Sequence, residues 1–473
     1  SETSSVNISG HEFMWSLTPF EQYMVDDDCV DSPMNFTFVW SCEGRVDRQR
    51  LQKVLDTMLP QHPLLTCQLK GKKWVSGDRR VVVQQAEQLD QYGREVETIE
   101  TEVVPLVVQL VDKPADCSEI HMTFHHAVCD GIGATEFCGD VFMAYANDFF
   151  GDIGKKKIAK RKQLGAVELL DSRNQLARPV VEDVSWFDAI RFLADEAKWF
   201  FLDRATAIPC DGIDDNVVRS AQLLSIQLTR EETVALRHSA DMRGASLNEF
   251  LMSLLTGVIG TFCQAPGQSE KSWVGVVQPV NMRPRFDRRM PACNSIGYAF
   301  YRRRIVECKC WEDLLPKMIS DSRAVGKYGL AGCFHDAIAV LQKVPNPFRK
   351  WFVRSMRPGT FVFSYLGDPR RRFAQPLGMS QDTVDLGDCK VVGFSAAPPP
   401  RKGAELGILA SLFGQRLTVW VRPSQKLAGT SSMKNLFALI ETAIREQVSA
   451  SEMPPVTSFG IAQVESEELA RSR

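Results

Sequence analysis

The stretch IHMTFHHAVCDGIGATEFCGDVFMAY, residues 120–145, decides the fold, because it holds a strand signal directly followed by a helix signal. Ile120, Met122 and Phe124 alternate with their neighbours, which predicts a strand that turns one apolar face inward. Beyond it, apolar side chains recur at helical spacing over 131–145 and predict a helix. The residues HHAVCDG span the turn between the two.

His126 stands where the strand would end, and its side chain is the first candidate for chemistry. If the strand continued by one residue, the imidazole would point to the same side as Phe124, away from water. An imidazole with an ordinary pKa of about 6.5 can accept a proton near neutral pH. Asp130 and Gly131 follow at the turn, where a carboxylate can brace the chain or meet an arginine and a glycine permits unusual backbone angles.

The residues alone leave two other interpretations of the histidine pair open. Adjacent histidines in such a turn can be packed and satisfied in the core without any chemical role. His121, His125 and Asp130 could also be ligands of a metal ion. No fourth ligand is evident, however, and the cysteines lack the spacing of a metal site, so we expect no metal.

Length and composition set the class of protein. At 473 residues the chain exceeds the ~250–300 residues at which single hydrophobic cores stop growing, so we expect two domains. With 44% hydrophobic and 24% charged residues it is typical of a soluble globular protein. A net charge of -2 gives no overall attraction to nucleic acid. No apolar run reaches ~18 residues, so we expect no transmembrane segment.

The cysteines and the amino-terminal sequence favour a cytoplasmic location. The 13 cysteines are scattered without a CxxC pair, which fits reduced thiols better than a disulfide framework. The opening SETSSVNISGHEF has neither the charged region nor the apolar region of a secretory signal.

Strand and helix signals alternate on both sides of the central stretch and predict an α+β fold. The expected strands cover 34–40, 104–111, 119–125, 273–280, 298–306, 359–365, 406–413 and 416–421, and the expected helices cover 51–59, 184–204, 230–241, 247–263 and 433–444. A basic stretch over 155–162 has no apolar face. We therefore expect a first subdomain over 1–182, a connecting helix and linker over 183–215, a second subdomain over 216–452 and a polar tail over 453–473.

The turn residues match a known motif. HHAVCDG, residues 125–131, resembles the HHxxxDG motif of the chloramphenicol acetyltransferase-like superfamily. That superfamily includes condensation domains of nonribosomal peptide synthetases, polyketide-associated and alcohol acyltransferases, wax ester synthases and plant BAHD acyltransferases. Further tracts resemble the family in the same order: LTPFE at 17–21, HPLL at 62–65, QPVNMRPR at 278–285 and NSIG at 294–297. The resemblance extends from about residue 13 to about residue 447.

The resemblance implies two chloramphenicol acetyltransferase-like subdomains, each with a mixed sheet flanked by helices, and an active-site tunnel at their interface. By position in the motif, His126 would be the catalytic base and His125 would support the loop. Asp130, beside Gly131, would be mainly structural and would pair with Arg283 from the second half.

A second tract separates the branches of the superfamily. FSYLGD, residues 363–368, stands in place of the S-N-x-G tract of condensation-like and alcohol acyltransferase members, with Tyr365 where Asn is usual. Ser364 is therefore a candidate for stabilising the tetrahedral intermediate. The DFGWG motif of BAHD enzymes has no counterpart, so the chain is less similar to that branch.

The activity that the resemblance implies is a stand-alone acyltransferase with a histidine base and no acyl-enzyme. The co-substrate would be acyl-CoA or the phosphopantetheine thioester of an acyl carrier protein, and the acceptor a small alcohol or amine. No bound cofactor or nucleic acid is expected, no residue is assigned to cofactor binding, and a monomer is expected. The alternatives are a non-catalytic binder of a thioester or carrier protein, and a protein that binds metal or nucleic acid through its histidines and basic runs.

Overall fold

The computed structural model describes residues 13–29, 32–77, 79–86, 103–151, 163–177, 205–210, 223–264, 272–284, 286, 288–373, 377, 380 and 382–450. The expected basic stretch over 155–162, the expected helix over 184–204 and the polar tail over 453–473 lie outside these residues.

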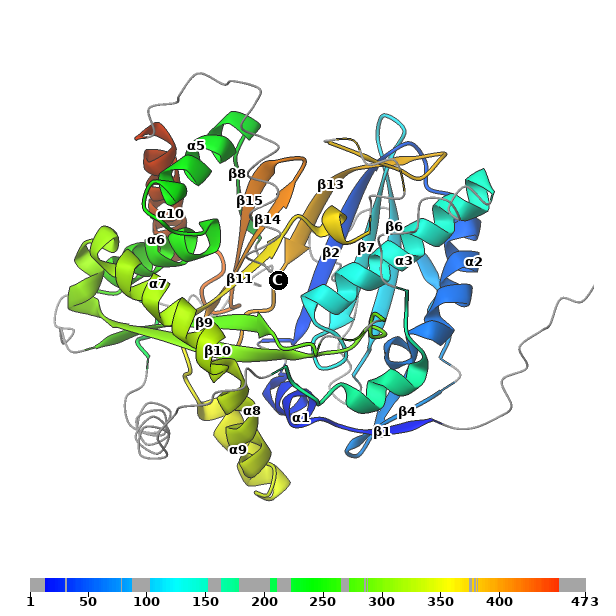
Figure 1. The fold of residues 1–473 in the computed structure, drawn as a ribbon, viewed down its shortest axis with the longest axis horizontal. Coiled ribbons are helices and arrows are strands. Elements are labelled where there is room, and N and C mark those ends of the chain that lie inside the picture. Colours follow the sequence, from blue (N-terminus) through cyan, green and yellow to red (C-terminus); the bar gives the residue numbers. More distant parts are fainter. Residues whose placement is uncertain are drawn as a thin grey trace, which may run out of the picture.

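Two six-stranded mixed sheets form the frame of the protein and lie side by side (Figure 1). The first sheet has the strand order β12-β13-β2-β7-β6-β5. Its strands are β2 (Asn35–Glu43), β5 (Val83–Ala86), β6 (Leu106–Lys113), β7 (Cys117–His125), β12 (Val384–Asp385) and β13 (Lys390–Ala397). All pairs are antiparallel except β5 with β6, and β2 pairs with β7 so that Asn35 lies opposite His125.

The second sheet has the strand order β10-β9-β11-β14-β15-β8. Its strands are β8 (Leu224–Gln227), β9 (Trp273–Asn281), β10 (Ile296–Arg304), β11 (Phe361–Gly367), β14 (Leu406–Phe413) and β15 (Arg416–Pro423). β11 runs parallel to both of its neighbours, whereas the other pairs are antiparallel. A small third sheet holds β1 (Met14–Ser16), β3 (Gln68–Lys70) and β4 (Lys73–Val75).

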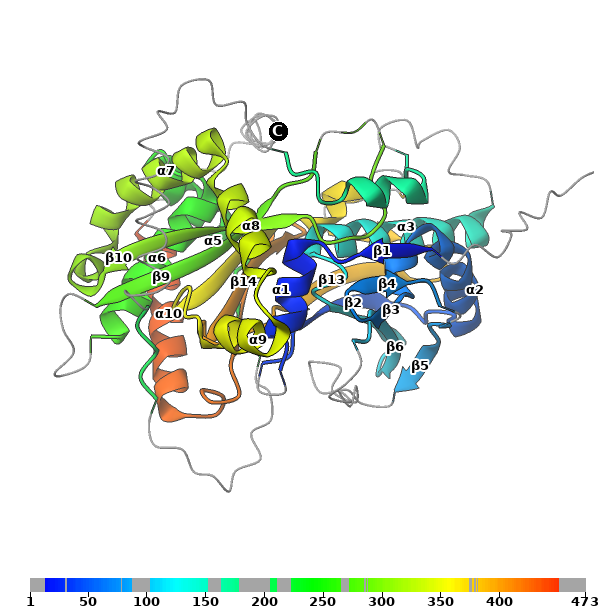
Figure 2. The same cartoon turned by 90° about the horizontal axis from the view of Figure 1, so that it is seen from below.

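Helices flank both large sheets, as expected for this α+β class (Figures 1 and 2). The helices beside the first sheet are α2 (Arg48–Met58) and α3 (Gly131–Phe150). The helices beside the second sheet are α5 (Arg230–Asp241), α6 (Leu247–Phe262), α7 (Trp311–Tyr328) and α10 (Ser431–Ser449). Between these two groups of elements lie α1 (Pro19–Asp27), α8 (Leu330–Leu341) and α9 (Asn346–Ser355). No helix among the described residues is long and apolar enough to cross a membrane.

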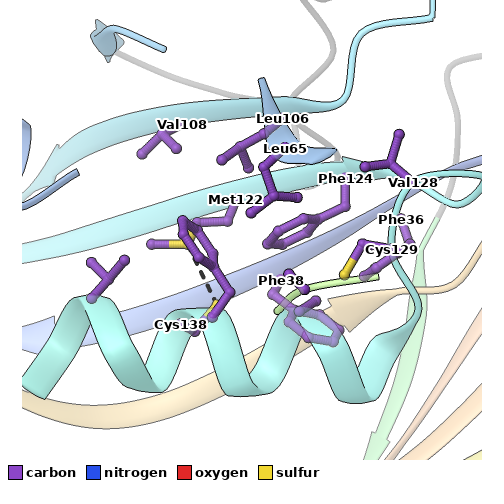
Figure 3. Packing of buried hydrophobic residues seen from close by; sticks show 14 of the residues in the cluster. Phe36, Phe38, Leu65, Leu106, Val108, Met122, Phe124, Val128, Cys129 and Cys138 are labelled. Atoms are coloured by element: carbon purple, nitrogen blue, oxygen red, sulfur yellow. Dashed lines mark hydrogen bonds between the residues drawn. The ribbon is translucent and has the colours of Figure 1, made fainter. Parts of the chain in front are cut away.

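The core beneath α3 holds β7 and its continuation in place. Met122 and Phe124 of β7 are fully buried and meet side chains from α3 (Figure 3). Cys138 of α3 places its sulfur 3.4 Å from that of Met122. Because strand and helix are packed together on this face, the connection between them, which carries His126, has little freedom.

The two halves of the chain exchange elements. β12 and β13 lie within the segment expected to form the second subdomain, yet β13 pairs with β2 of the first sheet. In the opposite direction, α1 from the first half packs against α8 and α9 (Figure 2). The expected division at 183–215 therefore does not account for every strand of each sheet.

Candidate active site

The pairing of β2 with β7 delivers His126 to the space between the sheets. The last paired residues are Asn35 and His125, and the backbone N–H of His126 then donates to the carbonyl of Met34 at 2.7 Å. The chain turns immediately afterwards, since the N–H of Val128 donates to the carbonyl of His125 at 2.9 Å. The imidazole of His126 meets the ring of Phe36 edge-on, with 5.2 Å between centroids.

The hydrogen bonds around His126 determine which ring nitrogen is free. Asn294 of the second half lies beside both the backbone carbonyl of His126 and Nδ1 of its ring. Nδ2 of Asn294 donates to the same carbonyl at 2.5 Å and lies 3.4 Å from Nδ1. The Asn294 amide therefore lies on the Nδ1 side of the ring, and a neutral imidazole has one donor nitrogen and one acceptor nitrogen. Nε2 forms no hydrogen bond with any residue that the structure describes.

Burial keeps this imidazole neutral. Desolvation lowers the pKa of His126 below its ordinary value of 6.5, and the nearby charges of His125 and Arg401 act in the same direction. The charge of Asp130 opposes this but does not outweigh it. At neutral pH the side chain is therefore in the form that can accept a proton.

Asp130 is buried and fully engaged. Its Oδ1 accepts hydrogen bonds from the backbone N–H of Gly133 and from Nη2 of Arg283, both at 2.9 Å, and its Oδ2 accepts from the N–H of Ser295 at 2.7 Å. Burial alone would raise the pKa of Asp130, but the Arg283 guanidinium and the hydrogen bonds hold it below its usual value. Asp130 also caps the amino terminus of α3.

Arg283 lies after β9 in the second half of the chain, so its ion pair with Asp130 joins the two halves. Its Nη2 also donates to the carbonyl of Cys293 at 2.9 Å. Burial would lower the pKa of Arg283, but Asp130 raises it, so the guanidinium stays charged. The pairing that the resemblance implied is present.

A cavity of about 120 Å³ lies next to His126 and is enclosed by both sheets. Most of its wall is apolar; the polar side chains are His126, Asn281, Ser364, Tyr365 and the paired Asp130. The remaining wall comes from Phe36, Phe38, Gly131, Ile132, Pro279, Ile296, Leu366, Ala396, Ala397, Pro398, Pro399 and Leu409. Four expected site residues, His126, Asp130, Gly131 and Ser364, thus border the same space.

His125 is turned away from this cavity. Its Nδ1 accepts a hydrogen bond from the N–H of Ala127 at 3.1 Å, and its Nε2 lies 3.5 Å from Oδ2 of Asp28. Asp28 in turn accepts from the N–H of Met34 at 2.8 Å. His125 therefore ties the loop that holds His126 to the end of α1.

The alternative metal ligands are not gathered around one point. Nε2 of His121 lies 3.0 Å from Oε2 of Glu119, away from the Asp28 contact of His125. Among the residues that the structure describes, no group of three His, Cys, Asp or Glu side chains could hold a metal ion.

Several arginines of the second half are used within the fold. Arg289 pairs with Asp140 at 2.7 Å, Arg303 with Asp321 at 2.6 Å, and Arg370 with Asp368 at 2.7 Å. Arg285 lies outside the described residues. These three arginines therefore serve ion pairing within the fold.

Two residues of the site were not nominated from the sequence. Asn294 fixes the His126 carbonyl, and Phe36 supports the imidazole ring. Asn294 belongs to the NSIG tract, which had been matched only as a resemblance, and Phe36 lies on the inward face of an expected strand. The Asn294 contact depends on the two sheets meeting, whereas the Phe36 contact is made across neighbouring strands of the first sheet.

Solved structures with the same fold cover nearly the whole chain. A trichothecene 15-O-acetyltransferase from Fusarium sporotrichioides superposes with a TM-score of 0.68 at 10% identity, over 94% of this chain and 96% of that chain. Polyketide synthase associated protein 5 from Mycobacterium tuberculosis gives a TM-score of 0.56 at 14% identity, over 91% of this chain and 98% of that chain.

A third structure was solved with ligands. It is a starter condensation domain of rhizomide synthetase in complex with C8-CoA and Leu-SNAC, with a TM-score of 0.61 at 13% identity over 93% of this chain and 96% of that chain. No family model and no curated protein matches the sequence. The likeness confirms the predicted chloramphenicol acetyltransferase-like fold, and the activity has to be argued from the site.

Proposed function

We propose that this protein is an acyltransferase that moves an acyl group from a thioester to a hydroxyl or amine acceptor, with His126 as the general base. The observation that carries the proposal is a neutral imidazole whose Nε2 is free, placed beside an apolar cavity between two sheets. A group in that state can take a proton from a weak nucleophile at neutral pH.

The proposed reaction needs one proton carrier and no acyl-enzyme. Nε2 of His126 accepts the proton of the acceptor as the acceptor oxygen or nitrogen attacks the thioester carbonyl. The tetrahedral intermediate then collapses, the carbon–sulfur bond breaks, and the imidazolium returns the proton to the departing thiolate. Ser364 borders the same cavity, and its hydroxyl makes no hydrogen bond with a described residue, so this hydroxyl can donate to the oxyanion.

Asp130 serves this scheme as a structural anchor. Both of its oxygens are occupied by donors from Gly133, Arg283 and Ser295, and its lowered pKa keeps it ionised. Its partners among the described residues do not include the imidazole of His126, whose Nδ1 lies 3.4 Å from Nδ2 of Asn294 instead. We infer that Asp130 acts by fixing the turn after His126.

The cavity favours an uncharged acyl or acceptor group. The described residues of its wall include no unpaired charged side chain, so a bound carboxylate or ammonium would be desolvated without a partner there. The phosphates of a CoA or phosphopantetheine donor would have to remain outside for the same reason. We therefore propose a thioester of a neutral acyl group as the co-substrate.

The proposal is tested by incubating the protein with a panel of acyl-CoAs and simple alcohols or amines. Free CoA and acylated acceptor should be separated by chromatography and identified by mass, because thiol-reactive dyes would also report the 13 cysteines of the protein. We expect free CoA to appear together with an equal amount of acylated acceptor. A thioester that binds but is never consumed would instead identify a non-catalytic binder.

A further inference from the structure

The helices α8 and α9 follow each other in the chain, and one side of α9 is packed against the rest of the protein. α9 lies against α1 at the surface of the protein (Figures 1 and 2). Arg349 and Val353, four residues apart, face inward and are 2% and 1% exposed. Nε of Arg349 lies 2.5 Å from Oδ2 of Asp26, which fixes the helix to α1. This side alone would hold α9 in place.

The opposite side of α9 is apolar without being packed. Phe348 and Trp351 are 67% and 70% exposed, and their spacing of three places them on the same face. Neither ring contacts another aromatic ring or a cation among the described residues. Val340, near the end of α8, is 65% exposed as well. Two large aromatic side chains on the same exposed helix face form an apolar patch that the described residues do not cover.

The same segment is basic. Between Asp336 and Asp368 the chain has five Lys or Arg residues and no acidic residue. Two of the five, Arg349 and Arg354, are bound to α1 and the residue after it. The other three, Lys343, Lys350 and Arg357, form no ion pair with any described residue. The exposed aromatic face is thus accompanied by uncompensated positive charge.

We propose that α9 and the loop before it are a docking surface for an anionic lipid bilayer, on which the protein lies without crossing it. Aromatic side chains at a helix surface insert at the boundary between headgroups and acyl chains, and lysines beside them attract anionic headgroups. A second copy fits this surface poorly, because a twofold contact would bring two basic patches together. An anionic lipid surface accepts the aromatic rings and neutralises the lysines at once.

Vesicle sedimentation tests the proposal. The protein should cosediment with vesicles of phosphatidylcholine containing phosphatidylserine and much less with phosphatidylcholine alone. Replacing both aromatics (F348S and W351S together) should weaken binding by at least about tenfold, because two large apolar groups no longer leave water. Replacing Lys343 and Lys350 by Glu should weaken binding to the anionic vesicles by about fivefold or more for each residue.

A matched control separates this face from exposed apolar residues in general. Met242, after α5, is 72% exposed, so M242S should leave vesicle binding unchanged. Melting temperatures close to that of the unaltered protein would show that the aromatic variant is folded. Absence of binding to anionic vesicles, or binding that F348S/W351S does not weaken, would overturn the proposal. So would a protein dimer, seen by analytical ultracentrifugation, that the aromatic substitutions abolish.

Discussion

Asn294 donates a hydrogen bond from Nδ2 to the backbone carbonyl of His126 at 2.5 Å, and the same nitrogen lies 3.4 Å from Nδ1 of the imidazole. Asn294 lies between β9 and β10 of the second sheet, whereas His126 follows β7 of the first. The proposed base is therefore positioned by a side chain from the opposite half of the chain. Its orientation depends on how the two sheets meet.

The positioning role of Asn294 can be separated from a purely structural one. Asn294→Ala should lower kcat about tenfold with little change in the donor KM, because the ring and its loop lose a fixed contact while the cavity wall stays intact. Asn294→Asp should in addition move the acid limb of the rate profile to higher pH, since a carboxylate beside the imidazole favours the charged form. Identical pH profiles for both variants would contradict this role.

The ion pair of Asp130 and Arg283 should matter more for stability than for donor binding. Asp130→Ala leaves a buried guanidinium without its partner, so we expect the free energy of unfolding, measured in urea, to fall by about 3–5 kcal/mol. Replacing both partners together, by D130N and R283M, should recover part of that loss because no buried charge is stranded. A decrease in the free energy of unfolding of less than about 1 kcal/mol would contradict the anchoring role. So would a free energy of donor binding that weakens by more than the free energy of unfolding.

The pH dependence of turnover follows from the partly buried imidazole of His126. Desolvation lowers the pKa of His126, so the neutral and active form persists below pH 6.5. The rate should be constant above this pKa and should decline only as the pH falls through it, when the base becomes protonated. A profile of kcat/KM against pH should therefore show an acid limb with a midpoint below 6.5. A midpoint above 7 would contradict the assignment.

Gly131 offers a way to narrow the cavity without disturbing the fold. A methyl group there would lie 3.8 Å from Cδ1 of Leu366 and 3.9 Å from Cζ of Phe38, which are ordinary contacts. Gly131→Ala should therefore fold normally but reject the bulkiest acyl group that the unaltered protein accepts, which acyl-CoA competition would show. Leu409→Ala, on another wall of the same cavity, should have the opposite effect. Unchanged acyl preference in both variants would place the substrate elsewhere.

Local sequence patterns predicted most of the frame. α5 has the expected bounds, 230–241, and α6 begins at the expected residue 247, capped by Ser246, and ends one residue early at Phe262. α3 runs five residues beyond the expected end, to Phe150, where Gly151 at a φ of 71° ends it. β10 covers Ile296–Arg304 instead of 298–306, because the next residues form a short 3-10 helix.

Long-range relationships escaped the sequence. α7, α8 and α9 and the strand β13 were not expected, and β13 joins the first sheet from deep within the second half. The contact of Asn294 with His126 spans 168 residues and has no local signal. The pair of Asp130 with Arg283 could be anticipated because a buried carboxylate requires a partner and the motif supplied one. Periodicity predicts elements, whereas the site depends on how the elements assemble.

The most direct test of the proposed mechanism is the turnover of His126→Ala with a saturating acyl donor, measured as free CoA and acylated acceptor. If His126 is the general base, His126→Ala should give a folded protein whose turnover is lower by roughly 10²–10⁴, the usual effect of removing a positioned general base. His125→Ala should lower stability more than rate, because His125 faces Asp28 and not the cavity. Near-normal turnover by His126→Ala would contradict the role of His126 as general base, since the proton must then be taken by another group.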